Sequence, residues 1–251
     1  MKKSLIIIFI LLLAFSFIAN YPTETYIFYS PHQDDETLFM SAGILDALDS
    51  GKRVVVVCMT DGSKSVAINK INKNLKDEGR KEISIEEFID TRNEEFKMSL
   101  KELGVREENI FFMNYVNEEI TYEEIQEVVL NFNRRYMNPT NLTLIGNDLC
   151  FSEKEKETHF EHRLIGDAIF DLFNSHKIRK ASFFSYIEPH NENTEKLSLN
   201  KYQIRKYHRA LDQYGVWDPD NKKYSVGHIS VTSFFEYYRV NPVLEYYEFK
   251  H

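Results

Sequence analysis

The sequence predicts an α/β protein with a Rossmann-like, doubly wound and mostly parallel sheet. Strand-like apolar runs alternate with helical patterns along most of the chain, the order that produces parallel sheets covered by helices. The runs at 26–29 and 53–59 are almost entirely apolar, as strands buried on both faces are. A chain of 251 residues that is 43% hydrophobic can bury one substantial core, so we expect a single domain.

The first half of the domain is expected to begin with a strand, a helix and a second strand. Residues 26–29 form a short aromatic and β-branched run that stops at a proline, as a buried strand would. A helix should run from Glu36 to Ser50, because Gly51 follows as a C-terminal stop, and a strand from Arg53 to Met59. The stretch from Lys64 to Glu82 is polar without clear periodicity and therefore predicts a solvated loop.

Capping signals mark the later helices. Ser84-Ile85-Glu86-Glu87 and Thr121-Tyr122-Glu123-Glu124 both match the capping-box pattern, and Gly104 ends the helix that begins after Ser84. The remaining predicted elements are strands at Asn109–Met113, Leu142–Gly146 and Ala181–Ile187, and helices that begin near His159 and span Lys201–Tyr214.

The N-terminus has the pattern of a secretory leader. Lysines at positions 2 and 3 precede an apolar run from Leu5 to Ala19 that only Ser16 interrupts. This predicts a signal peptide within residues 1–20, and hence a secreted or extracytoplasmic protein whose folded domain covers residues 21–251. The run is shorter than the roughly 20 apolar residues that span a bilayer. The alternative is an uncleaved membrane anchor, in which case this segment alone would contact the membrane.

Two polar clusters follow predicted strands. The first, His32 to Glu36, comes directly after the first strand, and the second, His159 to His162, follows the fourth after a loop. Ligands of open α/β sheets bind beyond the carboxyl ends of the strands, where the winding direction reverses. A strand order of 3-2-1-4-5 would place that point between strands one and four. We therefore expect the two clusters to meet.

The residue types in these clusters suit a catalytic zinc site, although another divalent transition metal is possible. Such a site has about three protein ligands and one position left to water, whose pKa falls to roughly 7. His32, Asp35 and His162 supply that set. The side chain of Asp34 must point away from that of its neighbour Asp35, because successive side chains diverge. Asp34 is therefore the candidate general base. His159 lies one turn from His162 and, when protonated, could stabilise an oxyanion and protonate a leaving amine.

Structural roles are the alternatives for these fragments. Asp34-Asp35-Glu36 at a helix start could serve only to complement the helix dipole. Thr158-His159-Phe160-Glu161 fits a capping box, so Glu161 could be an N-terminal cap; otherwise it would orient the imidazole of His159. The two clusters together, each after a strand, are an improbable product of capping alone.

The motifs resemble those of the LmbE/PIG-L family of zinc-dependent N-acetylglucosamine deacetylases. Pro31-His32-Gln33-Asp34-Asp35-Glu36 is similar to the Pro-His-x-Asp-Asp-Glu signature, and Thr158-His159-Phe160-Glu161-His162 to the His-x-x-His segment. Thr60-Asp61-Gly62 and the helix with Arg92 and Glu95 resemble further family segments, and the similarity runs from about Tyr26 to Phe173. The resemblance implies an LmbE-like fold, a zinc bound by His32, Asp35 and His162, Asp34 as the base, and His159 as the oxyanion or acid residue.

Departures from the family pattern accompany these matches. Gln33 stands where proline is commonest, at a position that binds no metal, and Phe160-Glu161 replaces a usual Pro-Asp. The segment from Ala210 to Trp217 resembles its family counterpart only in part, so it does not predict substrate contacts securely.

Two further residues are candidates for substrate binding. Arg92 could hold a hydroxyl or a phosphate, or it could form only a surface salt bridge. Trp217 could stack on a sugar ring, or it could only pack. The net charge of −8 argues against a sequence-independent nucleic-acid binder.

We therefore expect a zinc-dependent hydrolase that removes the N-acetyl group from an N-acetylglucosamine-type sugar or glycan, by attack of a metal-bound water. The alternatives are a metal-dependent hydrolase of another ester or phosphoester, and a non-catalytic carbohydrate-binding protein on the same fold. A phosphoesterase would usually need more carboxylates, and a binding protein would not need Asp34. A nucleotide-binding module is disfavoured, because no G-x-G-x-x-G follows the first strand.

Overall fold

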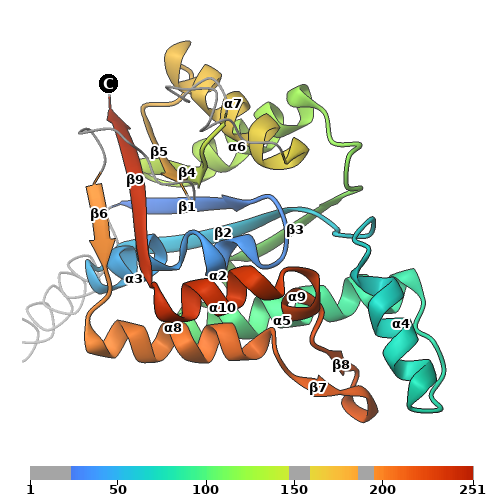
Figure 1. Ribbon diagram of the computed structural model, residues 1–251. Helices are drawn as coiled ribbons and strands as arrows, with labels where there is room; N and C mark the ends of the chain where they lie inside the picture. Colours follow the sequence, from blue (N-terminus) through green and yellow to red (C-terminus); the bar gives the residue numbers. More distant parts are fainter. Residues whose placement is uncertain (1–23, 147–158, 186–194, 251) are drawn as a thin grey trace, which may run out of the picture.

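The computed structural model describes residues 24–146, 159–185 and 195–250, which form one α/β unit with helices on both faces of a central sheet (Figure 1). Its seven strands lie in the order β3-β2-β1-β4-β5-β9-β6, and β7 and β8 form a separate small hairpin. The strands are β1 (Thr25–Ser30), β2 (Arg53–Thr60), β3 (Ile110–Tyr115), β4 (Pro139–Leu144), β5 (Lys180–Ser185), β6 (Glu195–Ser198), β7 (Trp217–Asp218), β8 (Lys223–Tyr224) and β9 (Val243–Lys250). The helices are α2 (Asp35–Leu38), α3 (Ser41–Asp49), α4 (Ala67–Asp77), α5 (Ile85–Leu103), α6 (Tyr122–Arg135), α7 (Phe160–Asn174), α8 (Lys201–Gln213), α9 (Val226–Ser230) and α10 (Thr232–Val240), with the short 3-10 turns η1 (Glu107–Asn109) and η3 (Pro219–Asn221).

The first five strands of the sheet confirm the predicted fold and strand order. β1 pairs in parallel with β2 and β4, β2 with β3, and β4 with β5. Beyond β5 the sheet continues with β9 and β6, which were not predicted and which run antiparallel to their neighbours. The sheet is therefore parallel where the clusters of polar residues emerge and antiparallel at its far edge.

The alternation of side chains along the strands divides the core into two layers. Ile27 and Tyr29 of β1 point to the face covered by α6 and α7, whereas Phe28 points to the face covered by α3, α5, α8 and α10 (Figure 1). The buried strands are apolar almost throughout because both of their faces are covered. Strand β1 thus lies at the centre of the molecule, and the loop that follows it is held from both sides.

The segment between β2 and α5 differs from its prediction. Residues 64–82 were expected to form a solvated loop, but α4 occupies most of that segment. Its apolar side chains recur every four residues, and Ala67, Ile71 and Leu75 are buried in a small cluster with Phe88 of α5 and Tyr224 of β8. Only these three buried positions and the partly buried Ile68 are apolar in this helix, so its period was hidden among the surrounding Lys and Asn residues.

Replacing Ile71 with alanine is therefore expected to lower the free energy of unfolding by about 2–5 kcal/mol, because the deletion leaves a cavity in a filled cluster. Chemical denaturation followed by circular dichroism measures this change. Lys73 is exposed on the same helix, and Lys73→Ala is the matched control, with an expected change within about 0.5 kcal/mol. Equally small changes in both variants would show that α4 does not pack as described.

The predicted helix from Glu36 to Ser50 is divided into α2 and α3. The break falls at Phe39 and Met40, whose φ angles are −118° and −122°. Both side chains are buried. The break turns the chain so that α2 stays beside β1 while α3 packs under the sheet.

The predicted N-terminal leader, residues 1–20, lies outside the described residues. Among the helices of the described chain, none combines the length and apolar character required to cross a membrane.

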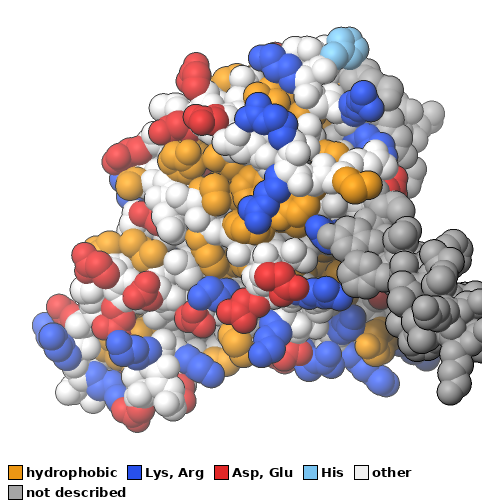
Figure 2. Space-filling model, turned by 180° about the vertical axis from the view of Figure 1, so that it is seen from behind, with side chains coloured by type: hydrophobic (Ala, Val, Ile, Leu, Met, Phe, Trp, Pro, Cys, Tyr) orange, Lys and Arg blue, Asp and Glu red, His pale blue; other side chains and the backbone are white. Residues whose placement is uncertain are grey.

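The face behind the view of Figure 1 carries charges of both signs around a hydrophobic centre (Figure 2). Edge strand β3 has partly buried side chains along most of its length. Lys97 lies over the ring of Phe112 and Arg135 over that of Phe111. These cations cover part of the edge strand, a feature that limits edge-to-edge pairing with other chains.

Candidate functional site

A pocket of about 610 Å³ opens beyond the carboxyl ends of the parallel strands. Its walls come from the segments that follow β1, β2, β3 and β4, and from α9 and α10. Both predicted polar clusters meet in it, as the strand order requires. Its lining residues are His32, Asp34, Asp35, Leu38, Phe39, Lys64, Ser65, Val66, Arg92, Asn117, Glu118, His159, Glu161, His162, Ser230, Val231 and Phe234.

Three donor atoms form a compact triangle at the buried end of the pocket. Asp35 Oδ2 lies 3.1 Å from His32 Nδ1 and 3.1 Å from His162 Nε2, and the two imidazole nitrogens are 3.3 Å apart. All three residues are buried. Ligands about 2.0–2.2 Å from a tetrahedral zinc are separated by roughly 3.3–3.6 Å, so the triangle has close to the right size for such an ion.

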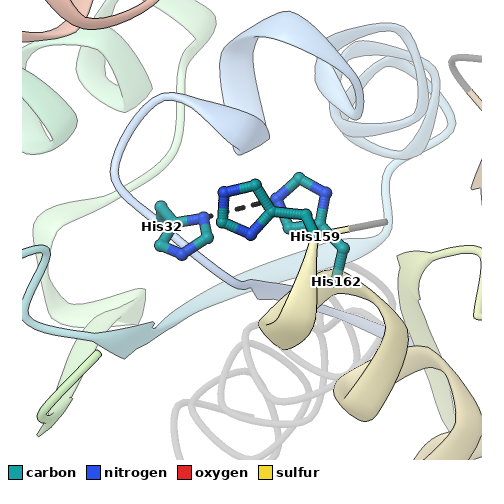
Figure 3. A group of neighbouring side chains, drawn as sticks. All are labelled: His32, His159 and His162. Atoms are coloured by element: carbon teal, nitrogen blue, oxygen red, sulfur yellow. Dashed lines mark hydrogen bonds between the residues drawn. The ribbon is translucent and has the colours of Figure 1, made fainter. Parts of the chain in front are cut away.

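His159 lies beside the imidazoles of His32 and His162 and adds a further nitrogen to this end of the pocket (Figure 3). Donor atoms of His32, His159 and His162 all lie within 4.8 Å of one another. The rings of His159 and His162 are stacked with their centroids 4.7 Å apart, as the three-residue spacing predicts. The side chain of His159 is 56% exposed, whereas that of His162 is 7% exposed. The Asp35 set is the tighter of the two possible donor sets, and His159 stands at its solvent side.

The two adjacent aspartates have opposite electrostatic environments. Burial opposes ionisation of Asp35, but the imidazoles of His162 and His32 outweigh it and hold the pKa of this carboxyl well below its usual value. Burial raises the pKa of Asp34, and the negative charge of Asp35 raises it further. Two neighbouring carboxyls with divergent pKa values are typical of sites where one holds a cation and the other handles protons.

Asp34 has an unusual backbone conformation. Its φ is 134°, which non-glycine residues rarely adopt and which costs of order 1–3 kcal/mol. The N–H of Asp34 donates to Glu36 Oε2 at 3.0 Å, and the preceding carbonyl, of Gln33, accepts from Arg92 Nη2 at 3.0 Å. The surrounding structure therefore maintains this conformation.

Glu36 is fully buried and hydrogen-bonded through both oxygens. Its Oε1 accepts from Thr37 Oγ1 at 2.5 Å and from the hydroxyl of Tyr214 at 2.6 Å. Burial raises its pKa to about 8. The hydrogen bonds of this carboxyl reach Tyr214, far along the chain, so complementing the helix dipole is not its only role.

Glu161 connects three segments of the site. Its Oε1 accepts from the N–H of Glu118 at 2.7 Å, while its Oε2 lies 3.3 Å from His159 Nδ1 and 3.6 Å from His32 Nε2. Burial would raise the pKa of Glu161, but the two imidazoles lower it well below its usual value. The helix begins at Phe160 with His159 as its N-cap, so the capping-box interpretation of Glu161 is wrong. Its carboxylate is used across the pocket instead.

Arg92 is buried against the loop after β1. Nη1 donates to the carbonyl of Gly62, and Nη2 lies 3.6 Å from Asp34 Oδ2 in addition to its bond to Gln33. A Cβ at Gly62 would come within 2.5 Å of Arg92 Nη1, and the φ of Gly62 is +70°, so a glycine is required there. Arg92 lines the pocket and is buried. The alternative expectation, a surface salt bridge, is therefore wrong.

Trp217 is not among the residues that line the pocket. Its indole donates to Glu78 Oε1 at 2.9 Å, and its ring lies 6.2 Å from that of Tyr224. The aromatic side chains that do line the pocket are Phe39 and Phe234, whose centroids are 5.6 Å apart. The ring of Phe39 also lies 6.4 Å from that of His162. An apolar wall thus begins beside the donor triangle and reaches the surface at Phe234, which is 38% exposed.

Sequence reasoning missed the residues that support the site from a distance. Tyr214 and the pair Asn117 and Glu118 were not singled out, because their contacts with Glu36 and Glu161 join segments far apart in the chain. One local signal was available for Tyr214. It is a tyrosine at the C-terminal end of an amphipathic helix, a position at which a buried hydroxyl needs a partner.

Comparison with known proteins gives one family match. The model of the GlcNAc-PI de-N-acetylase family (PIG-L) matches residues 27–173, more than half of the chain. No curated protein matches the sequence.

Several solved structures share the fold at low sequence identity. A triple mutant of a deacetylase involved in the teicoplanin biosynthetic pathway is 13% identical over 90% of this chain and 98% of that one, with a TM-score of 0.62. An N,N'-diacetylchitobiose deacetylase from Pyrococcus horikoshii is 18% identical over 78% and 72%, with a TM-score of 0.54. A 4-carboxy-2-hydroxymuconate hydratase from Pseudomonas putida is 14% identical over 91% and 97%, with a TM-score of 0.55. The fold alone therefore does not determine the reaction.

Proposed function

The chain belongs to the GlcNAc-PI de-N-acetylase (PIG-L) family, and we propose on this basis that it is a zinc-dependent hydrolase that removes the N-acetyl group from an N-acetylglucosamine-type sugar. The observation that carries the proposal is the donor triangle of His32, Asp35 and His162 beside Asp34, in one pocket. The deacetylase activities of the teicoplanin-pathway protein and the chitobiose enzyme support the same reaction class.

The donor triangle would hold the metal. Two imidazole nitrogens and one carboxylate oxygen, all buried and 3.1–3.3 Å apart, are a set that zinc accepts, and they leave a coordination position for water. When bound, zinc would lower the pKa of a coordinated water to about 7 and polarise the amide carbonyl. Glu161 Oε2 lies 3.6 Å from His32 Nε2, the ring nitrogen that faces away from the metal position, and would thereby orient that ring.

Asp34 is the proposed general base. It lines the pocket next to the triangle, yet none of its atoms belongs to the triangle, so its carboxylate is available to accept the proton of the attacking water. Asp34 would take one proton of the water, and the remaining hydroxide would add to the acyl carbon. The products are acetate and the free amine once the C–N bond breaks.

His159 is the proposed acid and oxyanion residue. Its Nδ1 is 3.3 Å from Glu161 Oε2, a contact that would orient the ring. A protonated His159 would stabilise the oxyanion of the tetrahedral intermediate and donate a proton to the departing amine. Its partial exposure places it where the sugar would enter.

The pocket suits an amino sugar. Lys64, Ser65 and Asn117 offer polar groups for sugar hydroxyls, while Phe39 and Phe234 offer an apolar surface for a ring face. An extracytoplasmic glycan remains the proposed substrate, since residues 1–20 have the pattern of a signal peptide.

The test is amine release from N-acetylglucosamine glycosides, including N,N'-diacetylchitobiose, by protein of known metal content. Amine and acetate are expected in equal amounts; their release should stop after dialysis against a chelator and return with Zn²⁺. Full activity in the chelated protein would contradict the metal requirement. Release of phosphate from sugar phosphates, without release of amine, would favour the phosphoesterase alternative.

A further inference from the structure

The peptide group between Gln33 and Asp34 is held at both of its polar atoms. Arg92 Nη2 donates to the Gln33 carbonyl at 3.0 Å, and the Asp34 N–H donates to Glu36 Oε2 at 3.0 Å. A peptide fixed at both ends cannot rotate, and its plane determines φ of the residue that follows. That residue is Asp34, whose φ is 134°.

Glu36 is itself held by groups from distant parts of the chain. Its second oxygen accepts from Tyr214 at the end of α8 and from Thr37, whose hydroxyl also lies 2.5 Å from Ser99 Oγ of α5. Glu36, Thr37 and Ser99 are all fully buried, so this arrangement excludes water.

The ring of Tyr214 is fixed as firmly as its hydroxyl. It is fully buried, and a Cβ at Gly227 would come within 2.4 Å of it, so the backbone of α9 packs directly on the ring. The carbonyl of Tyr214 accepts from Ser225 Oγ and from the N–H of His228, both at 3.2 Å. The hydroxyl therefore reaches Glu36 from a rigid position.

We propose that Glu36 and Tyr214 are positioning residues that hold the Gln33–Asp34 peptide in its strained orientation and thereby aim the Asp34 carboxylate into the pocket. This inference rests on the proposed function, because it assigns their effect to the base. Neither residue belongs to the donor triangle, so their loss should alter the position of Asp34 while the metal remains bound.

What the Asp34 N–H needs is an acceptor, not a charge. Glu36→Gln supplies one, since its amide oxygen can face the N–H while its amide nitrogen donates to the hydroxyl oxygens of Tyr214 and Thr37. Glu36→Met has similar length and no comparable acceptor. Tyr214→Phe removes one donor to Glu36 and leaves the ring in place.

The experiment measures kcat, KM, metal content and the crystal structure of each variant. Glu36→Met is expected to lower kcat about 100-fold, the scale of a misplaced catalytic group, with KM and metal content unchanged. Glu36→Gln should stay within about 3-fold of the parent protein, and Tyr214→Phe should lose about 10-fold, an intermediate effect. Tyr207→Phe is the matched control, since it removes a buried hydroxyl of the same helix that donates to the carbonyl of Tyr238, and its kcat should not change.

The crystal structures provide a readout independent of activity. In Glu36→Met, residue 34 should leave the region near φ 134°, whereas it should stay there in Glu36→Gln. An unchanged φ or kcat in Glu36→Met would overturn the inference, as would a Glu36→Gln variant as impaired as Glu36→Met. If Glu36→Met does not fold, an unchanged kcat in Tyr214→Phe overturns it. A parent protein that binds zinc but releases no amine would refute the proposed function, while the φ measurement would still decide the positioning.

Discussion

Replacing Asp34 with asparagine is expected to lower kcat for N-acetyl hydrolysis by about 10²- to 10⁴-fold, the range of general acid–base catalysis, while zinc stays bound. Asparagine preserves the shape of the side chain and tolerates positive φ better than most residues, so the strained backbone should persist. It cannot accept a proton from water. Single-turnover kinetics on protein of equal zinc content measures the effect.

The control for Asp34→Asn is Asp49→Asn. Asp49 is the last residue of α3, accepts a hydrogen bond from Gln203 of α8, and lies outside the pocket lining. Its kcat should match that of the parent protein. Turnover by Asp34→Asn at the parental rate would remove this residue from the mechanism. Loss of zinc from Asp34→Asn would instead make Asp34 part of the metal site.

Removing one corner of the donor triangle is expected to lower metal affinity by more than about 100-fold, which is the upper limit for losing a residue that only hydrogen-bonds to a ligand. In His162→Ala two donors remain, which do not complete the set of three that catalytic zinc sites use. Activity should therefore fall with metal content. Competition with a zinc chelator followed by elemental analysis measures the affinity.

His159→Ala distinguishes the two possible donor sets. If Asp35 completes the triangle, His159→Ala should retain zinc and lose about 10²- to 10⁴-fold in kcat. If His159 is the third ligand, this variant should lose zinc as His162→Ala does. His208→Ala, at a partly buried histidine on α8 that lies outside the pocket lining, is the control and should change neither quantity.

Much of the fold could be predicted because strands and helices leave local periodic signals. The capping boxes at Ser84 and Thr121 lie at the starts of α5 and α6, and the Thr121 box is formed by both side chains. α4 was missed because its short apolar stripe is diluted by polar residues. Strand β9 and the edge strand β6 were missed because each is recognised by the strand with which it pairs. Propensity cannot report a pairing between segments so far apart in the chain.

In the site, too, features with a local sequence signal were predicted and contacts between remote segments were not. The positions of His32, Asp35 and His162 in one pocket agree with the prediction, as does the stacking of His159 on His162. Gln33, which stands where the family pattern has proline, forms a side-chain hydrogen bond that proline could not form: its Nε2 donates to Asn93 Oδ1 at 2.9 Å. Trp217, a predicted sugar contact, packs elsewhere, whereas Phe39 and Phe234 line the pocket. A single aromatic residue in a sequence carries no information about which cavity it faces.

By itself, the sequence determined the alternation of strands and helices that makes a mostly parallel sheet, the two motifs and the types of ligand they offer, because these depend on periodicity and on residues next to one another. Tertiary structure alone decided the donor distances, the use of Glu161 across the pocket, and the contact of Tyr214 with Glu36, 178 residues away. Such contacts depend on how the packed layers bring remote segments together, and no local sequence pattern encodes the distance between two remote side chains.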